Sequence, residues 1–226
     1  QDNPKDENGN YDFECIEAMD LEKLNNDMCR LLSGERIEMP VFNFKTGRRE
    51  YHGNYLRIEE SDVIIMEGIH SLNPAMTYKL EESDKYKIYI SPLNQLYIDD
   101  KDGQRVKVST MDSRLLRRMV RDYRTRGNDV ESTLSMWKSV RNGEEKYIFP
   151  YESEADVMFN SGLLYEYTAV GKAAKPLLQA VGQGSKYYEE VQRLLKFVNM
   201  FRDIDEGCIP ANSILREFIG GGCFDI

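Results

Sequence analysis

The chain has 226 residues with 41% apolar and 31% charged side chains, which suits one large globular domain with a sizeable core, or one domain plus an appendage. No apolar run approaches the length of a membrane span and no signal-type segment opens the sequence, so no membrane association is expected. The net charge of −9 argues against a surface that seeks nucleic acid as a whole.

Four cysteines are scattered without a Cys-x-x-Cys pair, so the sequence predicts neither a zinc site nor a disulfide framework. They are Cys15, Cys29, Cys208 and Cys223. Reduced thiols in a cytoplasmic protein are the simplest interpretation. The chain opens with Gln1, which fits a mature secreted chain or a piece of a longer protein, and the cysteine usage favours the second.

The N-terminal part begins with a polar, loop-like lead-in over residues 1–12. Asp20 is placed to cap a helix whose leucines repeat at helical spacing until a glycine is reached. Residues 37–44 alternate poorly around Pro40, which indicates an edge strand or an extended loop, and a basic turn follows. His52, in the polar stretch beyond, is predicted to face solvent.

Val63–Met66 is a short apolar run, the pattern of a strand buried on both faces of a parallel sheet. Glu67 would then stand at the carboxyl edge of a central strand, where ligands bind in open α/β sheets, with His70 close enough to touch one. A carboxylate there can equally cap a helix or pair with a lysine. A second strand is predicted at residues 86–91. The segment 93–109 is either a two-stranded flap or, as we favour, a plain surface loop.

The segment Asp112–Asn128 predicts an amphipathic helix that ends at Gly127. Its apolar arc comprises Leu115, Leu116, Met119, Val120 and Tyr123. Its opposite arc carries Arg114, Arg117, Arg118, Arg121 and Arg124. Five guanidinium groups on neighbouring turns repel one another, so the helix gains by contacting anions. Either these arginines pair with the chain's own carboxylates, or they form a phosphate clamp, to which the planar guanidinium is suited.

The rest of the chain is predicted to hold another helix, a third strand and a helical C-terminal part. The ranges are 129–141 for the helix, 155–159 for the strand, and 169–181, 187–202 and 212–219 for the C-terminal helices. Strands that alternate with helices favour an α/β fold.

The sequence contains neither a Gly-x-Ser-x-Gly elbow nor a Gly-x-Gly-x-x-Gly loop. A Walker A loop needs Gly-x-x-x-x-Gly-Lys-[Ser/Thr]. The Gly171-Lys172 pair is followed by Ala173, and Glu166 stands in place of the first glycine. The sequence therefore has a candidate phosphate clamp but no phosphate cradle.

Five segments follow one another in a characteristic order and spacing: Tyr11–Asp20, Met39–Arg49, Asp62–His70, Ser113–Asn128 and Glu154–Asn160. Together they resemble the P-loop uridine kinase and phosphoribulokinase family. The resemblance implies an α/β fold with a partial P-loop kinase-type parallel sheet flanked by helices. It also implies a kinase-like domain over 1–160, whose Walker A loop precedes the matched segments in a longer protein, and a C-terminal helical extension over 161–226. The C-terminal part resembles a bacterial branch in which TGS and threonyl-tRNA synthetase-like domains come first.

Carried over residue by residue, the resemblance implies a phosphoryl-transfer site that uses ATP and Mg²⁺. Glu67 would lie near the magnesium and the phosphates, and Arg118, Arg121 and Arg126 would form a lid over the phosphoryl groups. The substrate-binding candidates are Phe13, Glu14, Phe42 and His70. Of these, Glu14 would hold ribose hydroxyls and Phe13 would pack against the sugar or base.

Four positions depart from the family pattern and lack polar groups that read a pyrimidine base. They are Phe42, Gly47, Asn128 and Met136. The leading interpretation is an ATP-dependent phosphotransferase, active in the longer protein and inactive as this fragment, that acts on a hydroxyl of a nucleoside or similar small molecule. Uridine itself is not indicated.

The alternative interpretation is a non-catalytic regulatory domain that binds nucleotides or anions on a kinase scaffold. RNA binding by the arginines is disfavoured by the overall acidity of the chain. Loss of central sheet elements would expose apolar surface, so self-association into a homo-oligomer is a further expectation.

Overall fold

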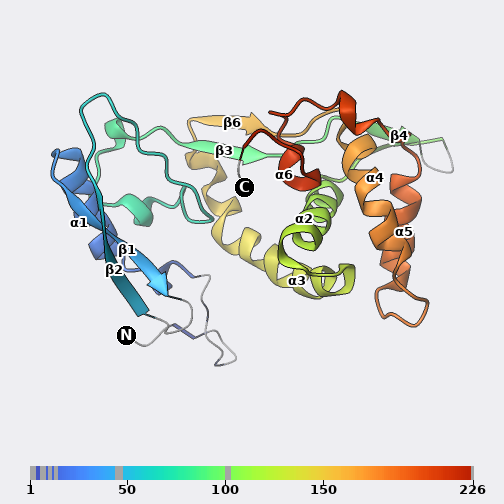
Figure 1. Cartoon of the computed structure of the whole chain (residues 1–226), viewed down its shortest axis with the longest axis horizontal. Coiled ribbons are helices and arrows are strands. Elements are labelled where there is room, and N and C mark those ends of the chain that lie inside the picture. The colour runs from blue at the N-terminus through green and yellow to red at the C-terminus, as the bar shows by residue number, and fades with distance from the viewer. Residues whose placement is uncertain are drawn as a thin grey trace. The chain divides into compact units, whose positions relative to one another are not determined.

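The computed structural model describes residues 4–5, 9, 12, 15–43, 48–99 and 103–224 (Figure 1). By its contacts the chain forms two compact units. Unit 1 comprises Gln1–Tyr89 and Gly143–Val157, and unit 2 comprises Ile90–Asn142 and Met158–Ile226. The division at residue 160 implied by the family resemblance stays a prediction. All four cysteines are free, as predicted. Among the described residues, no helix combines the length and the hydropathy of a membrane span.

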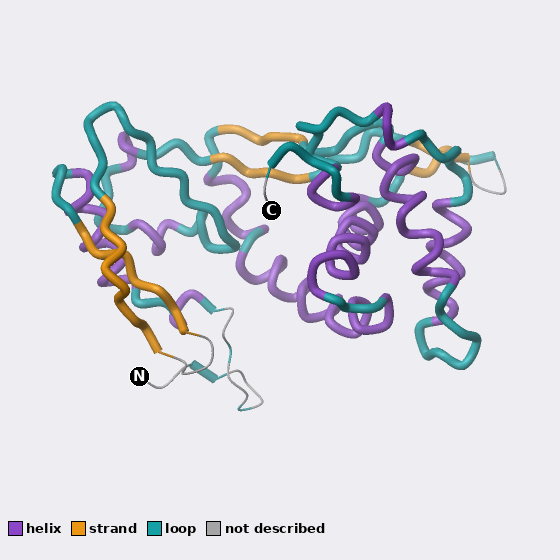
Figure 2. Tube along the Cα trace, viewed as in Figure 1, coloured by secondary structure: helices purple, strands orange, loops and turns teal. Residues whose placement is uncertain are grey.

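The N-terminal part of unit 1 contains an α-helix and an antiparallel strand pair, which Figure 2 shows in purple and orange. These elements are α1 (Leu21–Leu32), β1 (Ile37–Asn43) and β2 (Arg48–Leu56). The Asp20 carboxylate accepts the backbone N–H of Lys23, so the predicted helix cap is confirmed. Asp20 also binds Arg49 Nη2 at 2.8 Å, which ties β2 to the start of α1. The strand register shifts next to Pro40, and His52 is exposed as predicted.

The stretch Val63–Met66 is not a strand, which corrects the prediction of a central strand buried on both faces. Its side chains alternate. Ile64 and Met66 pack against the small apolar core of unit 1, whereas Val63 and Ile65 are 84% and 88% exposed. No described strand pairs with this stretch, so its outward side chains have no neighbour against which to be buried.

Two short strands, β3 (Ile88–Ser91) and β6 (Val157–Asn160), form a parallel pair. The N–H of Asp156 binds the carbonyl of Lys87, and the N–H of Ser161 binds the carbonyl of Ser91. Residue numbers increase in the same direction along both strands, as in a parallel pair. The predicted second and third strands are thus present with shifted bounds. Parallel strands with helices around them in the sequence confirm the α/β class.

A hairpin occupies the segment between β3 and the first helix of unit 2. Its strands are β4 (Tyr97–Asp99) and β5 (Arg105–Lys107), with Ile98 opposite Val106. The two-stranded flap is therefore the correct alternative for this segment, and the favoured alternative, a plain surface loop, is wrong. The hairpin forms because Leu96 and Ile98 are partly buried against the core of unit 2.

The core of unit 2 lies among helices (Figure 1). The α-helices that follow the hairpin are α2 (Thr110–Arg126), α3 (Val130–Tyr147, which continues into unit 1), α4 (Glu166–Gln179), α5 (Tyr188–Val198) and α6 (Arg216–Ile219). Helix α2 packs against α4 and α6, and α4 packs against α5. The four aliphatic residues of the predicted apolar arc of α2 are buried. Tyr123 is 54% exposed, because the last buried residue of α2 is Asp122 and the final turn has no core beside it.

Helix α2 ends at Gly127, whose φ of 68° lies in the left-handed region and whose N–H binds the carbonyl of Asp122. We expect Gly127→Ala to lower the free energy of unfolding by about 1–2 kcal/mol, because a Cβ is strained in this conformation. Urea denaturation measures the loss. The control is Gly182→Ala, at a glycine with open space around its Cβ position and no positive φ, where little change is expected. Equal losses at both positions would contradict the assignment.

Candidate anion-binding site

The arginines of α2 do not form one solvated face, because the fold gives them different partners. Arg117 turns inward and donates two hydrogen bonds of 2.6 Å to the carboxylate of Glu166. Arg124 donates to the carbonyls of Glu217 and Phe218 at 2.6 and 3.1 Å, which ties α6 to α2. The interpretation that the arginines pair with the chain's own carboxylates is therefore confirmed for Arg117, whereas Arg124 binds backbone carbonyls.

The predicted lid arginines share a single carboxylate, that of Asp122. Arg118 Nε lies 3.2 Å from Asp122 Oδ2. Arg121 approaches Oδ1 with Nε and Nη2 at 3.2 and 3.1 Å, and Arg126 Nη1 lies 3.1 Å from the same oxygen. These four residues are named the Asp122 cluster. Three guanidiniums and one carboxylate leave two net positive charges in it.

The helical repeat explains how the Asp122 cluster forms. Arg118, Asp122 and Arg126 follow one another at i, i+4 spacing, so they lie on one face of α2, and Arg121 reaches the carboxylate from the adjacent position. The Asp122 side chain is 0% exposed, whereas those of Arg118, Arg121 and Arg126 are 23%, 27% and 52% exposed. The carboxylate is thus covered while its guanidinium partners stay partly open to solvent.

One further carboxylate approaches the cluster from the C-terminal part of unit 2. Glu217 Oε1 lies 3.9 Å from Arg121 Nη1, and its side chain is 38% exposed. At this distance and exposure the pair is weak, so it leaves Arg121 able to contact another anion.

The other predicted site residues belong to unit 1, and two of them lie outside the residues that the structure describes. Phe13 and Glu14 lie outside the described residues. Phe42 is exposed on β1. Glu67 is exposed in an irregular segment, so its predicted place at the edge of a strand is wrong, while a role near magnesium stays a prediction. His70 is buried and meets the ring of Tyr147 edge-on, with 5.1 Å between centroids.

Asp12, next to the predicted sugar-binding pair, is held by residues that the sequence did not single out. Its Oδ2 accepts a hydrogen bond of 3.0 Å from Tyr147 Oη, and its Oδ1 accepts the N–H of Cys15 at 3.1 Å. Lys146 Nζ lies 3.7 Å from Oδ2. Burial raises the pKa of Tyr147, which further favours the protonated phenol that donates this hydrogen bond. No local pattern signals this contact, because Asp12 and Tyr147 are 135 residues apart.

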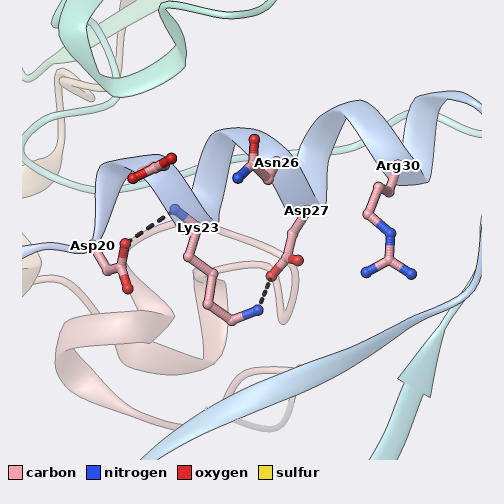
Figure 3. A pocket seen from close by; sticks show the side chains of 6 residues that line it. Asp20, Lys23, Asn26, Asp27 and Arg30 are labelled. Carbon is pink, nitrogen blue, oxygen red and sulfur yellow. Dashed lines mark hydrogen bonds and ion pairs between the residues drawn. The ribbon is translucent and has the colours of Figure 1, made fainter.

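A surface hollow of about 360 Å³ lies along α1 and its cap (Figure 3). It is lined by Asp20, Glu22, Lys23, Asn26, Asp27 and Arg30. Lys23 Nζ binds Asp27 at 2.8 Å, so the lining charges are partly neutralised by one another. The hollow contains none of the predicted site residues. Within the described part of the chain, no group of three His, Cys, Asp or Glu residues is placed to hold a metal ion.

Fold and site together define an α/β protein that carries an arginine cluster with net positive charge. Such a cluster is suited to bind phosphate groups. The sequence model of the Phosphoribulokinase / Uridine kinase family matches residues 1–101 and 105–165. The chain belongs to this family, whose P-loop kinase-type fold is consistent with the parallel strand pair and its helices.

Curated relatives agree with this placement. A uridine kinase of Halalkalibacterium halodurans is 33% identical over 154 residues, which are 68% of this chain and 62% of the relative. A uridine kinase of Halobacterium salinarum is 28% identical over 162 residues, 71% of this chain and 62% of the relative. The uridine-cytidine kinase 2-B of Danio rerio is 27% identical over 155 residues, 68% of this chain and 51% of the relative. The matched region thus spans between about half and two thirds of these relatives.

Proposed function

We propose that the functional protein is an ATP-dependent phosphotransferase of the uridine kinase type, which passes the γ-phosphoryl group of ATP to a hydroxyl of a nucleoside or similar small molecule. The observation that carries the proposal is the Asp122 cluster, in which three guanidiniums outnumber one carboxylate within the region that the family matches. Negative charge on a transferring phosphoryl group is stabilised by cations held in place. Arg118, Arg121 and Arg126 are assigned this role.

The residues present fit the cofactors that such a reaction uses. Two net positive charges on partly exposed guanidiniums suit the polyphosphate of ATP. The family resemblance assigns Mg²⁺ to Glu67, an exposed carboxylate of unit 1, and Mg²⁺ commonly binds one or two carboxylates together with phosphate oxygens and water. The chain contains no Walker A sequence, so the phosphate cradle is assigned to another segment of the functional protein.

The proposed substrate class is broader than uridine. Phe42, at a position where the family pattern implies a tyrosine that meets the base, is exposed and carries no hydrogen-bonding group. Selection of a base depends on polar groups that pair with it. On the sugar side, Phe13 and Glu14 are the contacts that the family resemblance assigns.

The same proposal extends to the arrangement of the functional protein. The C-terminal segments that follow residue 160 resemble the branch with TGS and threonyl-tRNA synthetase-like domains before the kinase-like domain. Reading the coding sequence upstream of Gln1 tests this directly. The proposal requires an intact Gly-x-x-x-x-Gly-Lys-[Ser/Thr] loop in the reading frame.

The decisive experiment is an ATP-consumption assay of the full-length protein with a panel of nucleosides and related hydroxyl compounds. We expect turnover with at least one of them and none with residues 1–226 alone. ATP binding without turnover on any panel member would favour the non-catalytic binding domain instead. Absence of both binding and turnover would remove the kinase proposal.

A further inference from the structure

The carboxylate of Asp122 has an unusual environment for a helix residue. It is 0% exposed, and guanidinium nitrogens of three arginines lie 3.1–3.2 Å from its two oxygens. Asp122 Oδ2 and Arg118 Nε are both buried and 3.2 Å apart, yet neither atom has a well-directed hydrogen bond. A carboxylate withdrawn from water is unfavourable unless its partners compensate it, so this residue is coupled to the arginines around it.

The geometry points to Asp122 as a positioning residue for phosphate recognition. We propose that it holds Arg118, Arg121 and Arg126 in one arrangement, so that their remaining N–H groups meet a phosphate ester or polyphosphate together. This inference rests on the proposed function of the arginines. It assigns to Asp122 no contact with substrate.

The division of the two carboxylate oxygens supports positioning. Arg121 and Arg126 contact Oδ1, and Arg118 lies next to Oδ2. One buried carboxylate therefore holds three mutually repelling guanidinium groups at separate positions around it. Each guanidinium carries five N–H donors, and Asp122 engages only one or two of them. Binding is tighter when side chains are already ordered, because less rotamer freedom is lost on contact with the ligand.

Positioning and simple charge compensation predict opposite effects of removing the negative charge. Asp122→Asn keeps the size of the side chain and raises the net charge of the cluster. If Asp122 only neutralised the arginines, this variant would bind anions more tightly. If Asp122 positions them, binding weakens although the site is more positive.

The test is a calorimetric titration of the chain with inorganic pyrophosphate. We expect Asp122→Asn to weaken binding about tenfold, similar to the loss of groups that orient metal ligands. The matched control is Asp112→Asn, on the same helix, where the carboxylate binds Arg193 at 2.7 and 2.8 Å outside the cluster. The control should change binding less than about twofold. Unchanged or tighter binding by Asp122→Asn overturns the inference.

A second variant and a second readout cover the remaining outcomes. If Asp122→Asn does not fold, Asp122→Glu is the deciding variant, because it keeps the charge and moves the carboxylate by one methylene. Positioning predicts that this variant binds pyrophosphate more weakly. Charge compensation predicts unchanged binding. The Nε–H proton of Arg121, which binds Asp122 Oδ1, should exchange slowly with water in the wild type and faster in the folded variant. If the wild type binds no pyrophosphate, the proposed function fails, and equal exchange in wild type and variant then overturns the positioning role separately.

Discussion

Replacing Arg117 by methionine is expected to lower the free energy of unfolding of unit 2 by about 3–5 kcal/mol, the usual cost of breaking one side of a buried ion pair. The side chains of Arg117 and Glu166 are 8% and 3% exposed. Arg117 Nη2 also donates to the Ser161 carbonyl at 2.8 Å. Without the guanidinium, a buried carboxylate and a carbonyl lose their donor, and water does not reach either readily.

Urea denaturation of the single variants measures this effect. The control is Arg193→Met, which breaks the more exposed pair with Asp112 and should cost clearly less, about 1 kcal/mol. The double variant Arg117→Met, Glu166→Leu should recover most of the loss, since apolar side chains of similar size can replace a buried pair. A loss below about 1 kcal/mol in Arg117→Met would show that the pair is not buried in solution.

The Arg117–Glu166 pair also matters for the candidate site. It connects α2 to α4, 49 residues later in the chain, and so fixes the rotation of α2 about its own axis. Arg118 is the next residue, and its direction toward Asp122 follows from that rotation. The buried pair and the Asp122 cluster therefore lie on the same helix and depend on the same rotation, so damage to the pair is expected to disturb the cluster.

The sequence predicted α2 well and its partners poorly. Helical spacing located the buried aliphatic residues and the end at Gly127, because both depend on neighbours along the chain. The burial of the Arg117 side chain depends on its pairing with Glu166, a partner that no local sequence pattern identifies. Asp122 was within reach of sequence reasoning, since it stands four residues from both Arg118 and Arg126.

Strand predictions failed where tertiary contacts decide. Val63–Met66 has the composition of a buried strand, but composition reports only a tendency to be buried, and no described strand lies alongside. The opposite error affected β4 and β5, whose short polar sequence suggested a loop. Contact of Leu96 and Ile98 with the core of unit 2 outweighs that composition.

Combined replacement of Arg118 and Arg121 by alanine is expected to weaken pyrophosphate binding by the chain about 100-fold or more. A hydrogen bond to a charged group is worth about 1.5–3 kcal/mol, and the variant removes at least two such bonds. It also leaves the buried Asp122 with only Arg126, whose side chain is 52% exposed, so the remaining negative charge repels the ligand. Calorimetric titration at fixed ionic strength measures the change, with circular dichroism to verify folding.

Two comparison variants separate a shaped site from a general attraction of anions. Arg30→Ala with Arg193→Ala removes the same charge from exposed arginines outside the cluster and should alter binding less than about twofold. Arg118→Lys with Arg121→Lys keeps the charge but loses the planar fork, so it should fall between the wild type and the alanine variant. If the alanine variant of the cluster binds as tightly as the wild type, the arginines do not form the anion site. If both alanine pairs weaken binding equally, net charge rather than geometry governs it.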